Sequence, residues 1–472
     1  MKNHIVKSII VSLSLITGFT SVKAQESATL QFMKGLPQST LQNPALHNDS
    51  SAVVVGMPGL SGMYLEVNSP FASYDLIHKG TGVLSDELVL DIDNFPKSLR
   101  KVNTLEQHLS LPLFYLGIRS KKSFFSLGIT EKQTSQLTFN KSLVQFIADG
   151  NAPYVGQNYD LGNLDMDAFH YREFALGYSN EMIKNKLTLG VKAKILYGKM
   201  AIQTQRNNMT VETAADGTSI LLNADMNISM SSPARVKYDS EGYFDGMEDE
   251  DMVPTDYMLQ NGNTGMAFDL GAVYKLSPKL TFSASIIDMG TISFTKDITT
   301  LDYTYTHNWE GIDFSNSIDK AQENYVKPGD LFTNEMDRIE ESFKPHQNNF
   351  GTKGFNTTIP VKVYLGGTYE LSPKVNIGLL ERFYKHGEFT QNTISLSGNT
   401  MLNNFLSLSG SYSVIGHQMN NLGLGMAVRA GFFQFYIVGD NMLALRPSRA
   451  QYANARFGVN FLMGRKRPLP VV

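Results

Sequence analysis

The chain has 472 residues, with 28 phenylalanines, 21 tyrosines and 39 glycines but no cysteine, and its formal net charge is −3 at pH 7. Without cysteine there is no disulfide, no thiolate metal site and no lipid-modified cysteine behind a leader. The acidic balance also argues against a nucleic-acid partner, which would favour a basic surface.

The first 24 residues are predicted to be a secretory signal peptide. Lys2 and Lys7 give the chain a positive start, and the apolar stretch 9–19 is too short to span a bilayer stably. Ala24 provides the small residue expected directly before a cleavage point. Removal of this leader takes away three lysines and no acidic residue, which lowers the net charge from −3 to −6.

Residues 25–58 follow the leader and contain the tripeptide Asn43-Pro44-Ala45. Proline fixes its own φ and holds the preceding residue in an extended conformation, and an asparagine side chain can bond to nearby backbone. The tripeptide matches no catalytic motif, metal site or phosphate-binding loop. We therefore interpret it as a structural turn and not as a set of binding residues.

Between residues 59 and 464, apolar and polar residues alternate in segments of about ten residues, which is typical of membrane-spanning β-strands. In the segment 187–198, one face is apolar and the other carries Lys192 and Lys194. Two lysines cannot point into hydrocarbon but can point into a water-filled lumen. No apolar run long enough for a transmembrane helix follows the leader. A soluble β-sandwich would also alternate, but with shorter strands and a more highly charged polar face.

Fourteen strands are predicted, and a closed single-chain barrel of this kind requires an even number. Short turns alternate with long connections, so the short turns are assigned to the periplasmic side. The segments 207–213 and 219–230 would raise the count to sixteen, but we interpret them as a hairpin above the barrel rim. The predicted strands are 60–67, 109–118, 123–132, 168–178, 187–198, 264–276, 280–291, 357–370, 375–386, 391–399, 405–415, 420–429, 432–440 and 452–463.

The predicted fold class is therefore all-β. It is a transmembrane antiparallel β-barrel of about 14 strands at residues 59–464, with long extracellular loops and a periplasmic tail at 465–472. Helices are predicted at 140–151 and 334–343, within the long connections. Aromatic residues at strand ends are predicted to form interfacial girdles, namely Tyr115, Tyr178, Tyr197, Tyr274, Tyr369, Phe383 and Tyr384.

Catalytic and cofactor-binding patterns are absent from the sequence, so we predict neither an enzyme nor a bound cofactor or metal. The histidines are dispersed without a zinc-binding pair, and there is no nucleophile elbow or phosphate-binding loop. The run 239–256 holds eight acidic residues and no basic one. We favour a solvated external loop for this run, and a calcium or cationic-ligand site is the alternative.

Several short motifs accompany the barrel pattern: Asn43-Pro44-Ala45-Leu46, two Leu-Ser-Pro-Lys turns, and the stretches 190–200, 286–290 and 438–441. In this order the chain resembles FadL-type outer-membrane proteins, PorV-like barrels and a Bacteroidota group of unknown function. The resemblance implies a place in the cell outer membrane. It also implies that residues 25–58 form a periplasmic N-terminal plug or hatch, with Asn43, Pro44 and Ala45 as its structural clasp.

Two functions follow from this resemblance. FadL-type proteins imply a barrel that admits hydrophobic or amphipathic small molecules through a plugged lumen, which is the function we expect. PorV-like barrels imply the alternative, a non-transport barrel that acts as a secretion, assembly or adhesion partner. The expected partners are outer-membrane lipids, together with hydrophobic small molecules in the first case and secretion or surface proteins in the second.

Overall fold

The computed structural model describes residues 28–464 except 34, 47–50, 81–86, 163, 249–252, 312–316, 318–324, 403–404, 416–417 and 442–446. The predicted signal peptide (1–24) and the predicted tail (465–472) lie outside the described residues. Within the described ranges, every helix is too short or too polar to cross a membrane.

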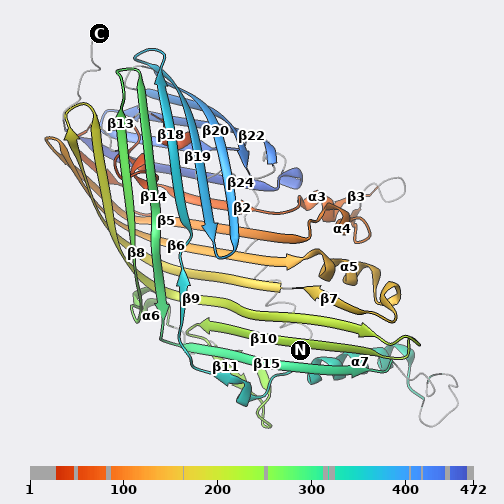
Figure 1. Ribbon diagram of the computed structural model, residues 1–472. Helices are drawn as coiled ribbons and strands as arrows, with labels where there is room; N and C mark the ends of the chain where they lie inside the picture. Colours follow the sequence, from red (N-terminus) through yellow and green to blue (C-terminus); the bar gives the residue numbers. More distant parts are fainter. Residues whose placement is uncertain are drawn as a thin grey trace.

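Fourteen antiparallel strands of the described chain close into a barrel (Figure 1). The last strand pairs with the first, which is formed by β1 and β2 together, so the ring has no open edge. Its strands are β1 (Val53–Gly56) with β2 (Met63–Asn68), β5 (Val102–Ser120), β6 (Ser123–Asn140), β8 (Leu164–Ile183), β9 (Leu187–Thr213), β13 (Asn263–Lys275), β14 (Leu280–Phe294), β18 (Val361–Glu370), β19 (Val375–His386), β20 (Phe389–Leu402), β21 (Leu406–Ile415), β22 (Gln418–Ala430), β23 (Phe433–Gly439) and β24 (Tyr452–Met463).

The fourteen predicted strands correspond to these fourteen, which confirms the predicted fold class and strand count. The predicted start of the barrel at residue 59 is wrong, because the wall begins at Val53. The stretch 57–62, which contains a Pro-Gly pair, interrupts this first strand, so only its second half shows a clear alternating pattern. We call the end of the barrel with the turns 121–122, 184–186, 276–279 and 371–374 the short-turn end.

One side of the wall continues beyond the ring at the opposite, long-connection end (Figure 1). The segment 207–213 is the far half of β9 and not a separate strand. It pairs with β10 (Ile220–Ser231), which pairs in turn with β15 (Ile298–Trp309). The segments excluded from the count therefore lie outside the ring, as predicted, but β15 falls in a stretch that we expected to be a loop.

The remaining elements lie in the long connections or at the N-terminus. Helices α5 and α7 confirm the two predicted helices, although α7 begins at Pro328 and not at residue 334. The other elements are α2 (Ala28–Gln31), α3 (Ser73–Leu76), β3 (Ile77–Lys79), β4 (Leu88–Leu90), α4 (Phe95–Ser98), α5 (Lys141–Asp149), β7 (Asn158–Gly162), β11 (Arg235–Tyr238), β12 (Phe244–Glu248), α6 (Pro254–Leu259), α7 (Pro328–Ser342), β16 (Phe350–Gly351) and β17 (Phe355–Thr358), with 3₁₀ turns at Pro37–Leu41, Ala152–Tyr154, Gln347–Asn349 and Pro447–Arg449.

The outer face of the ring is apolar and the inner face is polar. On β9 the outward Val191 and Ile195 are exposed, whereas Lys192 and Lys194 are buried inside, as predicted. The same outward exposure holds on the other side of the ring, at Leu379, Leu396 and Leu424 among others. An apolar outer belt over a polar interior is typical of barrels that face lipid.

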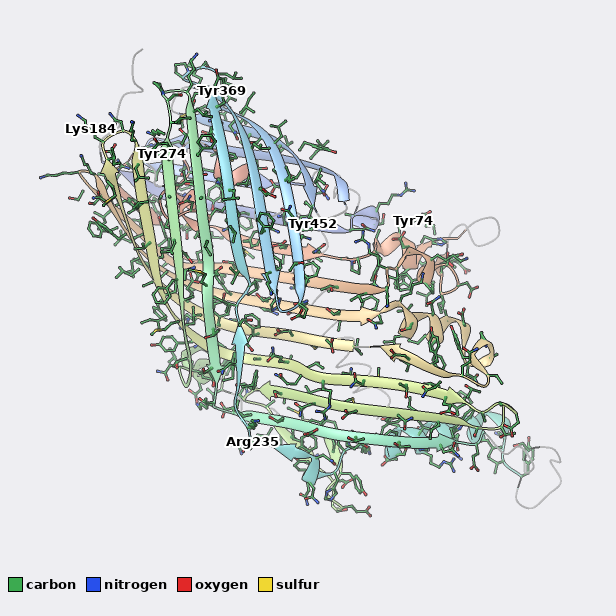
Figure 2. All side chains as sticks on the ribbon, in the orientation of Figure 1. Tyr74, Lys184, Arg235, Tyr274, Tyr369 and Tyr452 are labelled. Carbon is green, nitrogen blue, oxygen red and sulfur yellow. The ribbon has the colours of Figure 1, made fainter. Side chains whose placement is uncertain are left out.

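Five of the seven predicted girdle residues face outward or are half-exposed, and two do not. Tyr274 and Tyr369 lie near the short-turn end, where Figure 2 also labels Lys184. Tyr384 is buried inside the barrel, because it adjoins the outward Phe383 and neighbouring strand residues face opposite sides. Tyr115 also points inward, because a bulge between Pro112 and Phe114 shifts the alternation of β5.

Candidate functional site

Residues 28–46 lie inside the ring and contact opposite parts of its wall. Leu30, Met33 and Leu36 pack on β22 and β23, and Phe32 packs in a second cluster with residues of β14, β18 and β19. Polar contacts also reach around the ring: Thr29 Oγ1 bonds to Ser411 Oγ on β21 (2.7 Å) and to Asp440, Gln31 Nε2 donates to Ser283 Oγ on β14 (3.1 Å), and Gln38 Nε2 donates to Asn460 Oδ1 on β24 (2.7 Å).

The predicted tripeptide docks on the inner wall at β13 and β14. Asn43, which is fully buried, donates from Nδ2 to the carbonyl oxygens of Ala272 (3.2 Å) and Ala284 (3.1 Å). Its Oδ1 accepts the N–H of Ala45 (2.9 Å), which closes a local turn of the kind that asparagine favours. Asn43 therefore fixes both the shape of the tripeptide and its position against the wall.

Two glycines make room for the tripeptide. Gly190 on β9 and Gly271 on β13 pair directly with each other. A Cβ atom at Gly190 would lie 2.5 Å from the carbonyl carbon of Pro44, and one at Gly271 would overlap Asn43 Oδ1. The pair thus forms a notch in the inner wall, the Gly190–Gly271 notch, that no residue with a side chain could provide.

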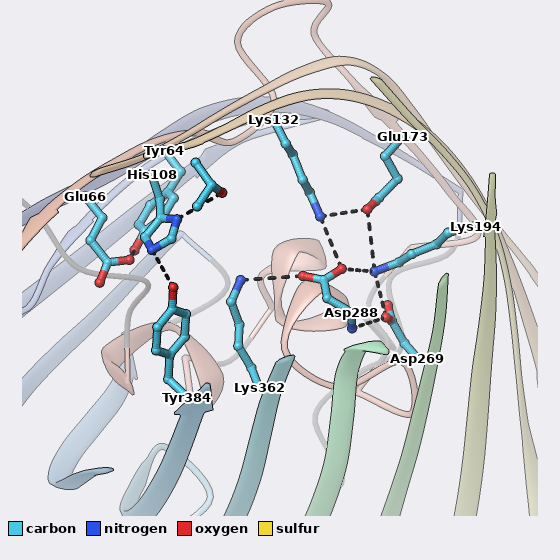
Figure 3. Close-up of polar contacts among 11 residues, drawn as sticks. Tyr64, Glu66, His108, Lys132, Glu173, Lys194, Asp269, Asp288, Lys362 and Tyr384 are labelled. Atoms are coloured by element: carbon cyan, nitrogen blue, oxygen red, sulfur yellow. Dashed lines mark hydrogen bonds and ion pairs between the residues drawn. The ribbon is translucent and has the colours of Figure 1, made fainter. Parts of the chain in front are cut away.

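A cluster of six charged residues lies next to this notch, and we call it the charge cluster (Figure 3). It holds three cations and three anions from six consecutive strands of the ring. Their ion pairs are Lys132–Glu173 (2.7 Å), Lys132–Asp288 (3.3 Å), Lys194–Glu173 (3.6 Å), Lys194–Asp269 (2.6 Å), Lys194–Asp288 (2.6 Å) and Lys362–Asp288 (3.5 Å). Because these charges are largely removed from water, each depends on its partners.

Asp288 is the centre of the charge cluster and sits on a β-bulge. Its φ of 63° is in the left-handed region, which is uncommon for a residue other than glycine, and the pairing shifts between Phe268 and Leu270 opposite it. The bulge leaves both Ile287 and Asp288 buried. The Asp288 N–H donates to Asp269 Oδ1 (2.8 Å), which holds the strained backbone in place. The stretch 286–290 noted in the sequence is this bulge.

Lys192 joins the notch to the charge cluster. It follows Gly190 on the same inner face of β9 and lies opposite Asp269 in the pairing with β13. Its Nζ donates to the carbonyl oxygen of Thr40 (2.5 Å), and Ser285 Oγ donates to that of Gln42 (2.6 Å). The backbone before the tripeptide is therefore held by side chains of the wall.

A second polar network lies in the lumen, on β2, β5, β19 and β24. Figure 3 shows four of its members, Tyr64, Glu66, His108 and Tyr384. Two buried carboxylates, Glu66 and Glu106, accept hydrogen bonds from tyrosine hydroxyls. The contacts are Tyr64 to Glu66 (2.5 Å), Tyr452 to Glu66 (2.9 Å), Tyr384 to Glu106 (3.0 Å) and Tyr384 to His108 Nε2 (2.9 Å). The two networks give the lumen a densely hydrogen-bonded polar lining.

The structure brings Asn43, Pro44 and Ala45 together at the wall, and it adds residues that sequence reasoning missed. Gly190, Gly271 and the charge cluster were not recognised in the sequence. The alternation that turns the lysines of the strands inward could have indicated the charge cluster. In the acidic run 239–256, residues 249–252 lie outside the described part of the chain. Among the described residues there is no group of three or more histidines and carboxylates that could hold a metal ion.

The sequence matches a known family model, and the fold has distant counterparts among solved structures. A sequence model of a family of unknown function, DUF5723, matches residues 44–440. No curated protein matches the sequence significantly. Solved barrels with a similar chain path are a FadL homologue of Pseudomonas aeruginosa (9% identity, 93% of this chain and 96% of that chain, TM-score 0.43) and the toluene transporter TodX of Pseudomonas putida (9%, 93% and 97%, 0.37). These values are too low to transfer a role to this chain.

Proposed function

The chain belongs to the DUF5723 family, whose function is unknown, and we propose that it is an outer-membrane channel for small amphipathic molecules, kept closed by its own N-terminal segment. The observation that carries the proposal is the position of residues 28–46, which cross the lumen and contact opposite walls. In this assignment the short-turn end faces the periplasm and the long connections face outward.

The way in which the segment is held supports a closure that is reversible. The described residues of 28–46 form a short helix and a 3₁₀ turn, and they contribute no strand to the ring. They are held by side-chain hydrogen bonds and small apolar clusters. The segment can therefore leave the lumen without breaking any strand pairing of the barrel.

The lining of the lumen supports an amphipathic passenger and not a purely apolar one. The wall next to α2 carries buried serines and asparagines at inward positions, and tyrosine hydroxyls and charges line other parts. An apolar molecule passing here would displace water from the hydrogen-bonding positions that these groups do not use with one another, which is costly. The buried inward serines and asparagines of β20, β21 and β24 are Ser395, Ser397, Asn399, Ser407, Ser409, Ser411, Ser413, Asn454 and Asn460.

Filling the Gly190–Gly271 notch tests the proposal. We expect the double variant Gly190→Ala/Gly271→Ala to unseat the tripeptide, because the added methyl groups overlap Pro44 and Asn43. Loss of two hydrogen bonds from Asn43 corresponds to about 2 kcal/mol, and so to a rise of about thirtyfold in the unseated population. The measurement is the rate of liposome swelling in small neutral solutes.

Gly398→Ala is the matched control, since a Cβ atom at this glycine of β20 would meet no other atom within 4 Å. It should swell liposomes at the rate of the native chain. We call the Gly190→Ala/Gly271→Ala protein the notch variant. The proposal fails if the notch variant, folded as judged by its heat-dependent gel mobility, admits solutes no faster than the control.

A further inference from the structure

A cavity of about 540 Å³ lies at the long-connection end of the lumen. Its lining comes from β2, β5, β6, β8 and β9 on one side and from the turn between β19 and β20 on the other. This volume is within the range of about 300–1,000 Å³ that is typical of small-molecule sites. The function proposed above assigns no ligand to this cavity.

Most of the residues that line the cavity have side chains that donate or accept hydrogen bonds. Amide side chains come from three strands, at Gln136, Gln203 and Gln391, and Asp167 adds a carboxylate. Between them lie a few apolar side chains, among them Phe389. The combination of apolar side chains with amides and a carboxylate matches a ring that has one C–H face and hydroxyls at its edge.

Two buried oxygen atoms at this end have no hydrogen-bond partner among the residues that the structure describes. One is Asp167 Oδ1, on a residue that lines the cavity. The other is Thr393 Oγ1, on a side chain that is 3% exposed. Thr393 follows Gln391 on the same face of β20 and pairs with Ile415, and both of these residues line the cavity. Buried polar atoms are normally paired, so these two are positions where a bound hydroxyl group or water would find a hydrogen-bond partner.

The charges at the cavity disfavour an anionic ligand. Three carboxylates line it, those of Asp165, Asp167 and Glu388, against one cation, Arg100. Asp167 Oδ2 is already engaged, at 3.3 Å from His386 Nε2 and 3.4 Å from Gln203 Nε2. Gln391 Oε1 accepts from the Arg382 guanidinium (3.1 Å), which leaves its NH₂ group to donate. A hydroxyl that accepts from one side chain and donates to Asp167 Oδ1 satisfies both groups.

We infer that this cavity binds a polyhydroxylated ring without anionic groups, of the chemical class of sugars. The inference deepens the proposed function and rests on it only for the place of the cavity at the outer mouth of the channel. The sugar ring would be the polar portion of the amphipathic molecule that the lumen admits.

Binding of neutral trisaccharides to the purified full-length protein tests the inference. The probes are maltotriose, cellotriose and tri-N-acetylchitotriose, measured by calorimetry, with laurate and toluene as apolar comparisons. The micelles must be of an amine-oxide detergent, because a maltoside head group would itself compete for the cavity. We expect at least one trisaccharide to bind saturably. Any binding of laurate or toluene should not change when the cavity is mutated.

Matched variants locate the site. Gln136→Ala/Gln391→Ala removes two lining amides and should weaken binding by about tenfold or more. Gln133→Ala/Asn392→Ala makes the same kind of change on the same two strands, at exposed outward positions, and should leave binding unchanged. The inference is overturned if no trisaccharide binds, or if both double variants weaken binding equally while both keep their heat-dependent gel mobility.

Swelling assays with the same trisaccharide separate this inference from the proposed channel. Binding that the lining amides control, with no uptake even after residues 28–46 are removed, would contradict the channel and support the site. Uptake that is equally fast in both double variants, without saturable binding, would contradict the site and support the channel.

Discussion

Replacing Asp288 by alanine is expected to lower the free energy of unfolding by about 3–5 kcal/mol, the usual cost of removing one partner from a buried ion pair. Lys132, Lys194 and Lys362 all contact this carboxylate, and Lys194 is almost fully buried. Alanine also tolerates the left-handed backbone of residue 288 poorly, at a cost of about 1–2 kcal/mol. The measurement is urea unfolding in detergent micelles, followed by heat-dependent gel mobility.

Two further variants separate charge from backbone strain at this position. Asp288→Gly removes the carboxylate but tolerates the backbone, so it should be less damaging than alanine. Asp288→Asn combined with Lys362→Gln restores the charge balance and should recover part of the loss, because the two residues interact directly. If Asp288→Ala unfolds at the same urea concentration as the native chain, the cluster does not stabilise the barrel.

Tethering the N-terminal segment to the wall is expected to close the notch variant again. The chain has no cysteine, so Thr29→Cys and Ser411→Cys would form the one possible disulfide. The hydroxyl oxygens of these residues are 2.7 Å apart, which suits a disulfide between the replaced side chains. In the Gly190→Ala/Gly271→Ala background, the oxidised tether should return swelling to the native rate, since residues 29 and 53 are then both fixed to the ring.

Reduction of the tether should restore the fast swelling of the notch variant. The single variants Thr29→Cys and Ser411→Cys, each in the same background, are the controls and should not respond to oxidation. If the notch variant with both cysteines swells liposomes equally fast when oxidised and when reduced, solutes do not pass where residues 28–46 lie.

The barrel could be predicted from the sequence because apolar and polar residues alternate along each strand, so the two faces of a strand can be distinguished. Lys192 and Lys194 between apolar residues were sufficient to assign an inner face to β9. The repeated Leu-Ser-Pro-Lys turns were also predictable, since Ser277 and Ser372 each accept backbone N–H groups within their own turns. Both signals are local and need no knowledge of which strands are neighbours.

The features that could not be predicted depend on bulges or on distant contacts. The bulge in β5 turns Tyr115 inward, and the bulge in β14 directs the Asp288 carboxylate into the lumen beside that of Asp269. One inserted residue reverses the alternation and leaves little trace in composition. The notch is formed by two glycines 81 positions apart in the chain, Gly190 and Gly271, which meet only when β9 pairs with β13. In β15, Tyr303, Tyr305 and His307 alternate with polar residues, but the strand was not recognised because it lies in a long connection.

The conductance of planar bilayers containing the mature chain, compared with a variant that lacks residues 28–46, tests the central claim most directly. Deleting the β11–β12 hairpin, residues 235–248, is the control, because these strands pair with each other and lie outside the ring. The account predicts little conductance for the native chain and the control, and large stable steps for the chain without residues 28–46. A folded deletion variant that conducts no better than the native chain would contradict it.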